Sequence, residues 1–188
     1  MGDRKAQILK EAAHLLVSQG YVGLTMRAVA RASGLKLGAL QYHYPTRLDL
    51  VSALAEWVAN QTTANFDSYR EQATTDPRNL HALVDFLLAD PLAGVLDLET
   101  LFEQLWAMAL VEPVIRELLD ALYEQYLVFI EDILRETGVE EPRPDALVIM
   151  AMLEGLTQFV GHGRRYSAHA EASVSSIHAF LEARYPPS

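Results

Sequence analysis

Residues 33–50 read SGLKLGALQYHYPTRLDL, and this stretch decides the fold of the N-terminal part of the chain. Gly34 suits the left-handed backbone position that ends a helix. The mixed apolar and polar residues over 36–43 then predict a short helix. Thr46, followed by Asp49 three residues later, predicts the capped start of a much longer helix. The stretch therefore predicts helices joined by tight turns.

The residues before this stretch extend the helical pattern. Apolar side chains on one face of 3–19 predict an N-terminal helix, and Gly20 predicts its end. Thr25 is a good N-cap for a second helix that runs to about Ser33. Two short helices joined by a tight glycine-containing turn form a helix-turn-helix. No stretch keeps a period of two beside turn residues, so we expect an all-α protein.

One face of the helix over 36–43 has the chemistry needed to read bases in a DNA groove. Leu40 is expected to pin the helix to the apolar interior, which leaves the opposite face free. Gly38 and Ala39 are small enough for close approach of the backbone to a groove. The side chains of Lys36 and Gln41 can hydrogen-bond base edges. Leu37 can pack on a thymine methyl group and Arg27 can reach a guanine.

Other side chains of the same region are placed to contact phosphates. Tyr42, His43 and Arg47 follow the recognition face and can donate hydrogen bonds to phosphate oxygens. Thr25 opens a helix whose N-terminus can face a phosphate. Two alternatives stay open, because His43 could instead cap a helix C-terminus and Tyr42 could, like Tyr44, fill the core.

The charge distribution agrees with contact between one end of the chain and phosphates. The formal net charge is −10, which by itself argues against nucleic acid. Residues 1–50 nevertheless carry seven basic and three acidic side chains, while the remaining residues carry eight basic and 22 acidic ones. A basic segment on an acidic body is the asymmetry expected when one end meets DNA.

Composition limits the other possibilities. The chain has 188 residues, 51% of them hydrophobic and 21% charged, which is typical of a globular protein. It has no cysteine, which excludes disulfides, thiolate zinc sites and cysteine nucleophiles. The longest apolar run, over 146–153, is too short to span a bilayer. The N-terminus lacks the pattern of a signal peptide, so we expect a soluble cytoplasmic protein without membrane contact.

Taken together, residues 20–50 resemble the DNA-binding head of the tetracycline-repressor (TetR) family of transcriptional regulators. The positions that correspond to the family pattern are Gly20, Thr25, Val29-Ala30, Ala32-Ser33-Gly34-Leu35, Gly38, Leu40-Gln41-Tyr42-His43-Tyr44, Arg47 and Leu50. Two positions depart from it. Gln41 stands where the family usually has tyrosine, and Tyr44 stands where it usually has phenylalanine.

The resemblance implies a two-part, all-helical protein. Residues 1–46 would form the helix-turn-helix DNA-binding domain, and residues 47–188 the ligand-binding and dimerisation domain. It implies a homodimer, most simply a repressor, that binds a near-palindromic double-stranded operator. A small hydrophobic or amphipathic effector would release the DNA. No cofactor is implied.

The rest of the chain reads as helices. The expected ranges are 46–73, 77–89, 97–110, 113–136, 144–162 and 168–184. In TetR-family proteins the last two long helices usually form the dimer. That resemblance makes the following apolar residues candidates for the dimer interface: Leu156, Phe159, Val174, Ile177 and Leu181. The alternative is that some of them belong to the ordinary core.

The same resemblance implies a ligand cavity among the helices from residue 97 onward. Wide or adaptable side chains suited to an apolar lining are Phe102, Trp106, Tyr123, Tyr126 and Met152. Polar residues within these apolar stretches are Glu103, Glu154 and Gln158. A carboxylate in such a cavity favours an amphipathic, cationic or hydroxyl-bearing ligand. Alternatively, Glu154 lies at the dimer seam and Glu103 faces solvent.

Two other classes of protein are weighed against this interpretation. A helix-turn-helix regulator without a small-molecule site is the nearer alternative. A catalytic or metal-storing bundle is the other, but a di-iron bundle needs two Glu-x-x-His motifs and the chain has one, over 11–14. The motifs of common hydrolases, P-loop proteins and zinc proteases are absent from the sequence. We expect no enzyme and no metal site, and read His81, His162, His169 and His178 as unrelated surface histidines.

Overall fold

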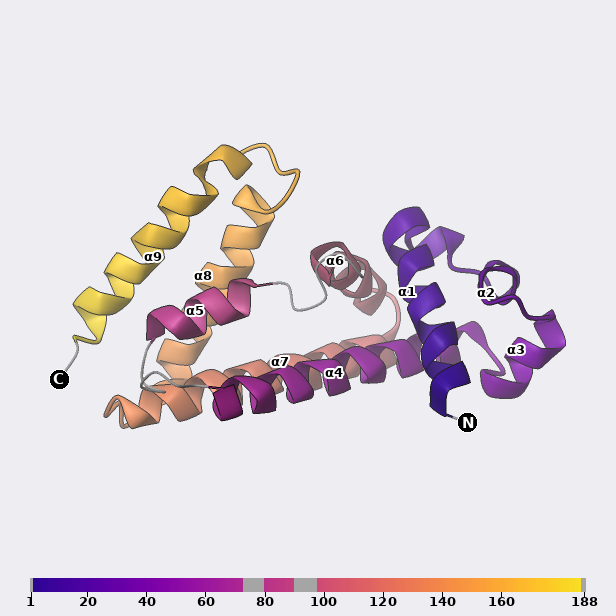
Figure 1. Ribbon diagram of the computed structural model, residues 1–188, viewed down its shortest axis with the longest axis horizontal. Coiled ribbons are helices and arrows are strands. Elements are labelled where there is room, and N and C mark those ends of the chain that lie inside the picture. Colours follow the sequence, from indigo (N-terminus) through magenta and orange to yellow (C-terminus); the bar gives the residue numbers. More distant parts are fainter. Residues whose placement is uncertain (1, 73–79, 90–97, 187–188) are drawn as a thin grey trace. The chain divides into compact units, whose positions relative to one another are not determined.

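The computed structural model describes residues 2–72, 80–89 and 98–186, and every regular element in these ranges is a helix (Figure 1). The elements are α1 Gly2–Gly23, α2 Met26–Ala32, α3 Leu37–His43, α4 Arg47–Gln72, α5 Leu80–Leu88, α6 Leu98–Ala109, α7 Pro113–Glu136, α8 Pro142–Val160, the 3₁₀ helix η1 Ser167–His169 and α9 Ala170–Arg184. The all-α fold expected from the sequence is confirmed. None of these helices is long and apolar enough to cross a membrane.

Most helix boundaries lie close to their expected positions, with local differences. The expected boundaries at Ala73, Pro77 and Asp97 and the break at Asp90-Pro91 lie outside the described residues. Helix α8 begins at Pro142, two residues earlier than expected, because proline is well suited to the first turn of a helix. The last helix is preceded by the turn of 3₁₀ helix η1, which takes up the residues where the sequence predicted its start.

The chain forms two compact units. Unit 1 comprises Met1–Ala64 and Pro91–Leu122, and unit 2 comprises Asn65–Asp90 and Tyr123–Ser188. Helices α4 and α7 contribute residues to both units. The functional boundary predicted at residue 46 therefore does not coincide with the division by packing. One reason is that α6 packs on α1 and so belongs with the N-terminal helices.

The core of unit 1 holds the N-terminal helices together. Ile8 and Leu16 of α1, Leu40 of α3 and Leu50 of α4 are fully buried. Gly20 interrupts α1 with a left-handed φ of 67°, after which one further turn completes the helix. The helix end that the sequence predicted at Gly20 is therefore a kink within α1.

Aromatic side chains dominate the core of unit 2. The rings of Phe66 and Phe129 stack with centroids 4.1 Å apart, and Tyr126 meets Phe66 edge-on at 5.0 Å. The same core contains Ile177, 9% exposed, and Leu181, 1% exposed. The sequence left open whether these two residues belong to a dimer interface or to the core of their own chain. Helix α9 packs on α5 and α8, so these residues are buried within a single chain.

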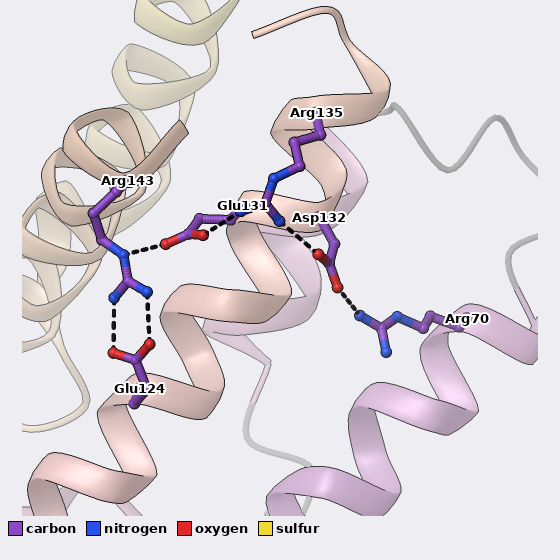
Figure 2. Close-up of polar contacts among 6 residues, drawn as sticks. All are labelled: Arg70, Glu124, Glu131, Asp132, Arg135 and Arg143. Atoms are coloured by element: carbon purple, nitrogen blue, oxygen red, sulfur yellow. Dashed lines mark hydrogen bonds and ion pairs between the residues drawn. The ribbon is translucent and has the colours of Figure 1, made fainter. Parts of the chain in front are cut away.

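A chain of ion pairs ties α4, α7 and α8 together within unit 2 (Figure 2). Its members are Arg70, Glu124, Glu131, Asp132, Arg135 and Arg143. Glu131 is buried and is paired with Arg135, at 2.6 Å, and with Arg143. Arg143 also donates two hydrogen bonds to the carboxylate of Glu124, at 2.7 and 2.6 Å, which lower the pKa of that carboxyl. The pairs therefore hold three helices in register.

Candidate nucleic-acid interface

The first helix of the helix-turn-helix begins at a capped end. Thr25 has extended backbone angles, and its Oγ1 accepts a hydrogen bond of 3.1 Å from the backbone N–H of Ala28. This bond satisfies one of the backbone donors that the first turn of a helix leaves unpaired. The N-cap predicted at Thr25 is confirmed. Arg27 projects from the same turn and is exposed.

The turn between α2 and α3 is closed by backbone hydrogen bonds. Gly34 has a left-handed φ of 65°, as its position predicted. Its N–H donates to the carbonyl of Arg31 at 3.1 Å, and the N–H of Leu35 donates to the carbonyl of Ala30 at 2.8 Å. This pair of bonds is the Schellman arrangement, which terminates a helix and redirects the chain. The angle between the two short helices is therefore encoded locally.

A long-range hydrogen bond supports this turn and was not foreseen. The guanidinium of Arg4 donates to the backbone carbonyl of Ser33 at 3.0 Å and to the Gln7 side chain at 2.6 Å. Arg4 is one of the basic residues that make the N-terminal segment positive. Its side chain forms hydrogen bonds within the chain, and a count of charges does not reveal this role.

Helix α3 buries one face and exposes the other, as predicted. Leu40 is fully buried, whereas Lys36, Gly38, Ala39 and Gln41 are exposed, and Leu37 is half-buried. A Cβ atom placed on Gly38 would meet no heavy atom within 4 Å, and its φ is not in the left-handed region. The fold of the chain itself therefore does not require glycine at this position.

The aromatic residues at the end of α3 divide between surface and core. The side chain of Tyr42 is 78% exposed and meets His43 edge-on, with ring centroids 5.5 Å apart. Tyr44 is buried, and its burial, followed by the charge of Glu56, raises the pKa of its hydroxyl. The core interpretation is thus confirmed for Tyr44 and is wrong for Tyr42.

Helix α4 starts at a reciprocal capping box. The Oγ1 of Thr46 accepts from the Asp49 N–H at 3.1 Å, and the Asp49 carboxylate accepts from the Thr46 N–H at 2.9 Å. The predicted cap is confirmed. The first helical residue, Arg47, lies with its guanidinium carbon 3.8 Å from the centre of the Tyr21 ring.

Tyr21 connects this arginine to α6 and is a residue that the sequence interpretation missed. Its backbone N–H donates to Oε1 of Gln104 at 3.2 Å. Its hydroxyl donates to Oε1 of Glu112 at 3.0 Å. An aromatic residue directly after the glycine kink was the only available indication, and local pattern alone does not distinguish it from a core residue.

Comparison with known proteins identifies this arrangement. Residues 8–54 match the family described as bacterial regulatory proteins, tetR family. This match supports a transcriptional regulator of the TetR family. The chain is 28% identical over 165 residues to the HTH-type transcriptional regulator LmrA of Bacillus subtilis (strain 168), an alignment that covers 82% of this chain and 84% of LmrA.

Two solved structures share the fold along almost the whole chain. A TetR-family transcriptional regulator from Rhodococcus sp. has a TM-score of 0.77 at 22% identity, and the alignment covers 98% of this chain and 100% of the other. A transcriptional regulator from Saccharomonospora viridis, solved in complex with choline, has a TM-score of 0.78 at 22% identity, with 97% of each chain covered. At this identity the likeness concerns the fold alone.

The residues predicted to bind a ligand fall in both units. Phe102, Glu103 and Trp106 lie on α6 in unit 1. The remaining ones lie in unit 2: Tyr123, Tyr126, Met152, Glu154 and Gln158. Within unit 2 the Tyr123 hydroxyl donates to Oε1 of Glu154 at 2.9 Å, and the Tyr123 and Tyr126 rings are 6.3 Å apart. Gln158 is exposed.

The remaining dimer candidates lie at or near the surface of α8 and α9. Phe159 is 64% exposed, while Leu156 and Val174 are half-buried. Further large apolar side chains on the same two helices are also exposed, although the sequence did not single them out: Leu147, Val148 and Phe180. Ordinary helical spacing does not show which of these side chains point away from the core.

The histidines of the regulator are not all unrelated, which corrects the sequence interpretation. The rings of His81 on α5 and His178 on α9 stack with centroids 4.4 Å apart. His81 lies 3.3 Å from a carboxylate oxygen of Glu182, and His178 lies 3.1 Å from one of Asp85. In the part of the chain that the structure describes, no group of three or more such donors is arranged to hold a metal ion.

Proposed function

We propose that this TetR-family regulator acts as a homodimer that binds a near-palindromic DNA operator through α3 and releases it when a small amphipathic molecule binds. The observation that carries the proposal is the outer face of α3. That face is exposed and includes a glycine that the fold does not require. A glycine that the fold of its own chain does not require is expected where another backbone or the wall of a groove approaches closely.

The exposed face of α3 has the donors needed to read bases. Lys36 and Gln41 reach outward from the helix, and bidentate contact by glutamine is the usual way of selecting adenine. The small Gly38 and Ala39 would allow the helix to enter the major groove. Leu37 would pack on a thymine methyl group, and Arg27 would reach a guanine.

Phosphate contacts would flank these base contacts. Tyr42 is exposed at the end of α3, with His43 beside it, and both can donate to phosphate oxygens. Arg47 and Thr25 stand at the N-termini of α4 and α2, where the helix dipole also favours an anion. These contacts would set register and affinity without selecting sequence.

Dimer formation would bury the exposed apolar residues of α8 and α9. Phe159 and Phe180 are too large to leave exposed on a monomer without cost, and together with Leu147 and Val148 they make these helices suited to a protein partner. A two-fold interface would use the same surface of each chain. Leu156 and Val174 would lie at its edge. Pairing two heads would supply the effective concentration that one half-site lacks.

The proposed effector is a small amphipathic cation. Tyr123 and Tyr126 offer aromatic rings, and Glu154 offers a carboxylate beside them. Aromatic rings with a carboxylate suit a quaternary or hydroxyl-bearing ammonium group. The choline bound to the Saccharomonospora viridis regulator supports this class. Phe102, Glu103 and Trp106 on α6, together with Met152 and Gln158, stay predictions for the same role.

Operator binding is tested by selecting duplexes from a random library with the full-length protein and measuring affinity at several salt concentrations. Gln41→Ala should relax preference at one base pair by about 1–3 kcal/mol. Tyr42→Phe and Arg47→Ala should weaken all sequences, and Arg47→Ala should also lower the salt slope by about one per head. Arg116→Ala, which removes an exposed charge from α7, is the matched control and should change little.

Either of two results would contradict the proposed operator binding by α3. A wild-type protein that enriches no duplex, or Gln41→Ala and Arg47→Ala variants that bind the selected duplex as tightly as wild type does, would refute this assignment of α3.

The effector is tested separately, by titrating choline and tetramethylammonium against the protein–operator complex. A coupling of about 1–3 kcal/mol, or roughly 5–150-fold in operator affinity, is expected for an effector of the right class. Glu154→Gln should reduce that coupling, whereas Glu171→Gln, an exposed change on α9, should not. Operator affinity that is unchanged by both cations would remove the cationic class from the proposal.

A further inference from the structure

We propose that Tyr21 is a positioning residue for DNA binding, which holds the guanidinium of Arg47 in place at the start of α4. The inference rests on the proposed operator binding. Tyr21 would not touch DNA itself. Its ring would serve as a platform that restricts Arg47 before a phosphate arrives.

The geometry of the stack leaves the donors of Arg47 available. The guanidinium carbon lies over the Tyr21 ring, 3.8 Å from its centre, which is close enough for the planar group to stack on the ring. The five N–H donors of an arginine lie in the plane of the guanidinium and point outward along its edges. Among the described residues, none accepts a hydrogen bond or forms an ion pair with the Arg47 side chain. Stacking therefore orders the group without using the donors that a phosphate needs.

The platform is itself held at two points. The Tyr21 N–H donates to Gln104 at 3.2 Å, and its hydroxyl donates to Glu112 at 3.0 Å. The left-handed kink at Gly20 sets the course of the chain just before the ring. A Cβ atom on Gly20 would come within 3.3 Å of the Gln104 side-chain oxygen, so a larger residue there would disturb this anchor as well as strain the backbone.

Preorganisation of this kind changes affinity without changing the number of contacts. An arginine side chain is rotamer-rich, and binding a phosphate normally restricts it at a cost in entropy. Tyr21 has already restricted Arg47 in the free protein. Removing the ring should therefore weaken operator binding about threefold to tenfold per head. The salt slope, which counts phosphates neutralised, should stay unchanged because Arg47 is still present.

The experiment is a double-mutant cycle on the selected operator, with the full-length wild type, Tyr21→Leu, Arg47→Ala and the double variant. Tyr21→Leu should weaken binding in the wild-type background. In the Arg47→Ala background it should change affinity less than about twofold, since the group that it positions is gone. Arg47→Ala alone should lower the salt slope by about one per head, and Tyr21→Leu should not.

Two conservative variants keep the test decisive if Tyr21→Leu folds poorly. Tyr21→Phe retains the ring and loses the hydrogen bond to Glu112, so it should lose less operator affinity than Tyr21→Leu. Arg47→Lys retains the charge and loses the planar stack. It should bind more weakly than wild type with an unchanged salt slope, and Tyr21→Phe should not weaken it further.

The outcomes separate this inference from the proposed function. Equal losses from Tyr21→Leu in both Arg47 backgrounds would mean that Tyr21 acts only on stability, and would overturn the inference. Normal operator affinity of Tyr21→Leu would overturn it too. An unchanged salt slope in Arg47→Ala would show that Arg47 is a structural strut, which also overturns it. A wild-type protein that selects no duplex would instead overturn operator binding.

Discussion

The recognition head, formed by α1–α3 and the capped start of α4, and the α8–α9 surface of unit 2 expose side chains of opposite chemistry. The head presents lysine, glutamine, tyrosine and glycine on a mostly aliphatic core. The α8–α9 surface presents phenylalanine, leucine and valine over a dense aromatic core. Both cores are apolar, so the buried residues do not indicate different functions for the two regions. The difference in exposed chemistry is what points the first region to DNA and the second to protein.

The two regions also obtain their precision in different ways. In the head, hydrogen bonds between residues three to five positions apart cap the starts of α2 and α4 and close the turn between α2 and α3. In unit 2, contacts across long sequence separations determine which face of a helix is buried. A substitution in the head should therefore act locally, while one in the core of unit 2 should act on the whole unit.

The largest effect is expected from a substitution that tests which face of α9 lies in the core of unit 2. Ile177→Asp places a carboxylate in the core of unit 2 and should lower the free energy of unfolding by about 3–5 kcal/mol. Phe180 is 46% exposed on the same helix, so Phe180→Asp should leave a folded chain but weaken the proposed dimer. Urea unfolding and sedimentation velocity measure the two effects. A dimeric, fully stable Ile177→Asp protein would contradict the buried position of α9.

The next prediction compares the loss of stability when a buried or an exposed carboxylate is removed from the same chain of ion pairs. Glu131 is buried between Arg135 and Arg143, so Glu131→Ala leaves both guanidinium groups without this partner and should cost about 1–3 kcal/mol. Glu124→Gln removes an exposed carboxylate and should change stability little, because solvent screens surface pairs. Chemical denaturation of both variants gives the comparison. Equal effects would show that burial does not decide the contribution of these pairs.

A smaller effect separates two glycines of the head. Gly34→Ala puts a side chain at a left-handed φ and should cost about 1 kcal/mol of stability. Gly38 is helical with open space around it, so Gly38→Ala should raise stability by up to about 1 kcal/mol. The same Gly38→Ala change should weaken operator binding if the groove wall approaches there. Thermal unfolding combined with operator titration distinguishes these roles.

The last effect arises only at alkaline pH and concerns Tyr185, the residue that follows α9. Burial, followed by a hydrogen bond to Asp145 and its charge, raises the pKa of Tyr185 to about 12. The folded chain therefore holds this proton more tightly than the unfolded chain, whose tyrosine titrates near pH 10. The resulting stabilisation is present below about pH 10 and is lost as the pH rises toward about 12. Tyr185→Phe should remove this part of the pH dependence, measured by urea unfolding between pH 9 and 12. An identical pH profile in that variant would exclude the contribution.

Several features of the head could be predicted because their causes are local. Thr25, Gly34 and the Thr46–Asp49 pair act through hydrogen bonds and dihedral angles within one turn of the chain. Residue type and order are enough to specify such bonds. The candidate DNA face of α3 followed from the same boundaries, since Leu40 sets which side of a short helix is inward.

The ligand and dimer residues were harder to predict because apolar character has two possible uses. Ile177 and Phe180 both lie on α9, yet one fills the core and the other faces outward. An apolar residue suits the interior of its own chain and the interface with a second chain equally well. Only the packing of α9 on α5 and α8 decides between these uses.

By itself, the sequence determined the helical class, most of the helix ends and the TetR-like head, because capping and periodicity depend on near neighbours. The tertiary structure alone decided that Arg4 supports the α2–α3 turn, that Tyr21 stacks on Arg47 and that His81 meets His178. Each of these contacts joins residues far apart in the chain. Their formation depends on how helices rotate and cross, which many residues set together and no short motif records.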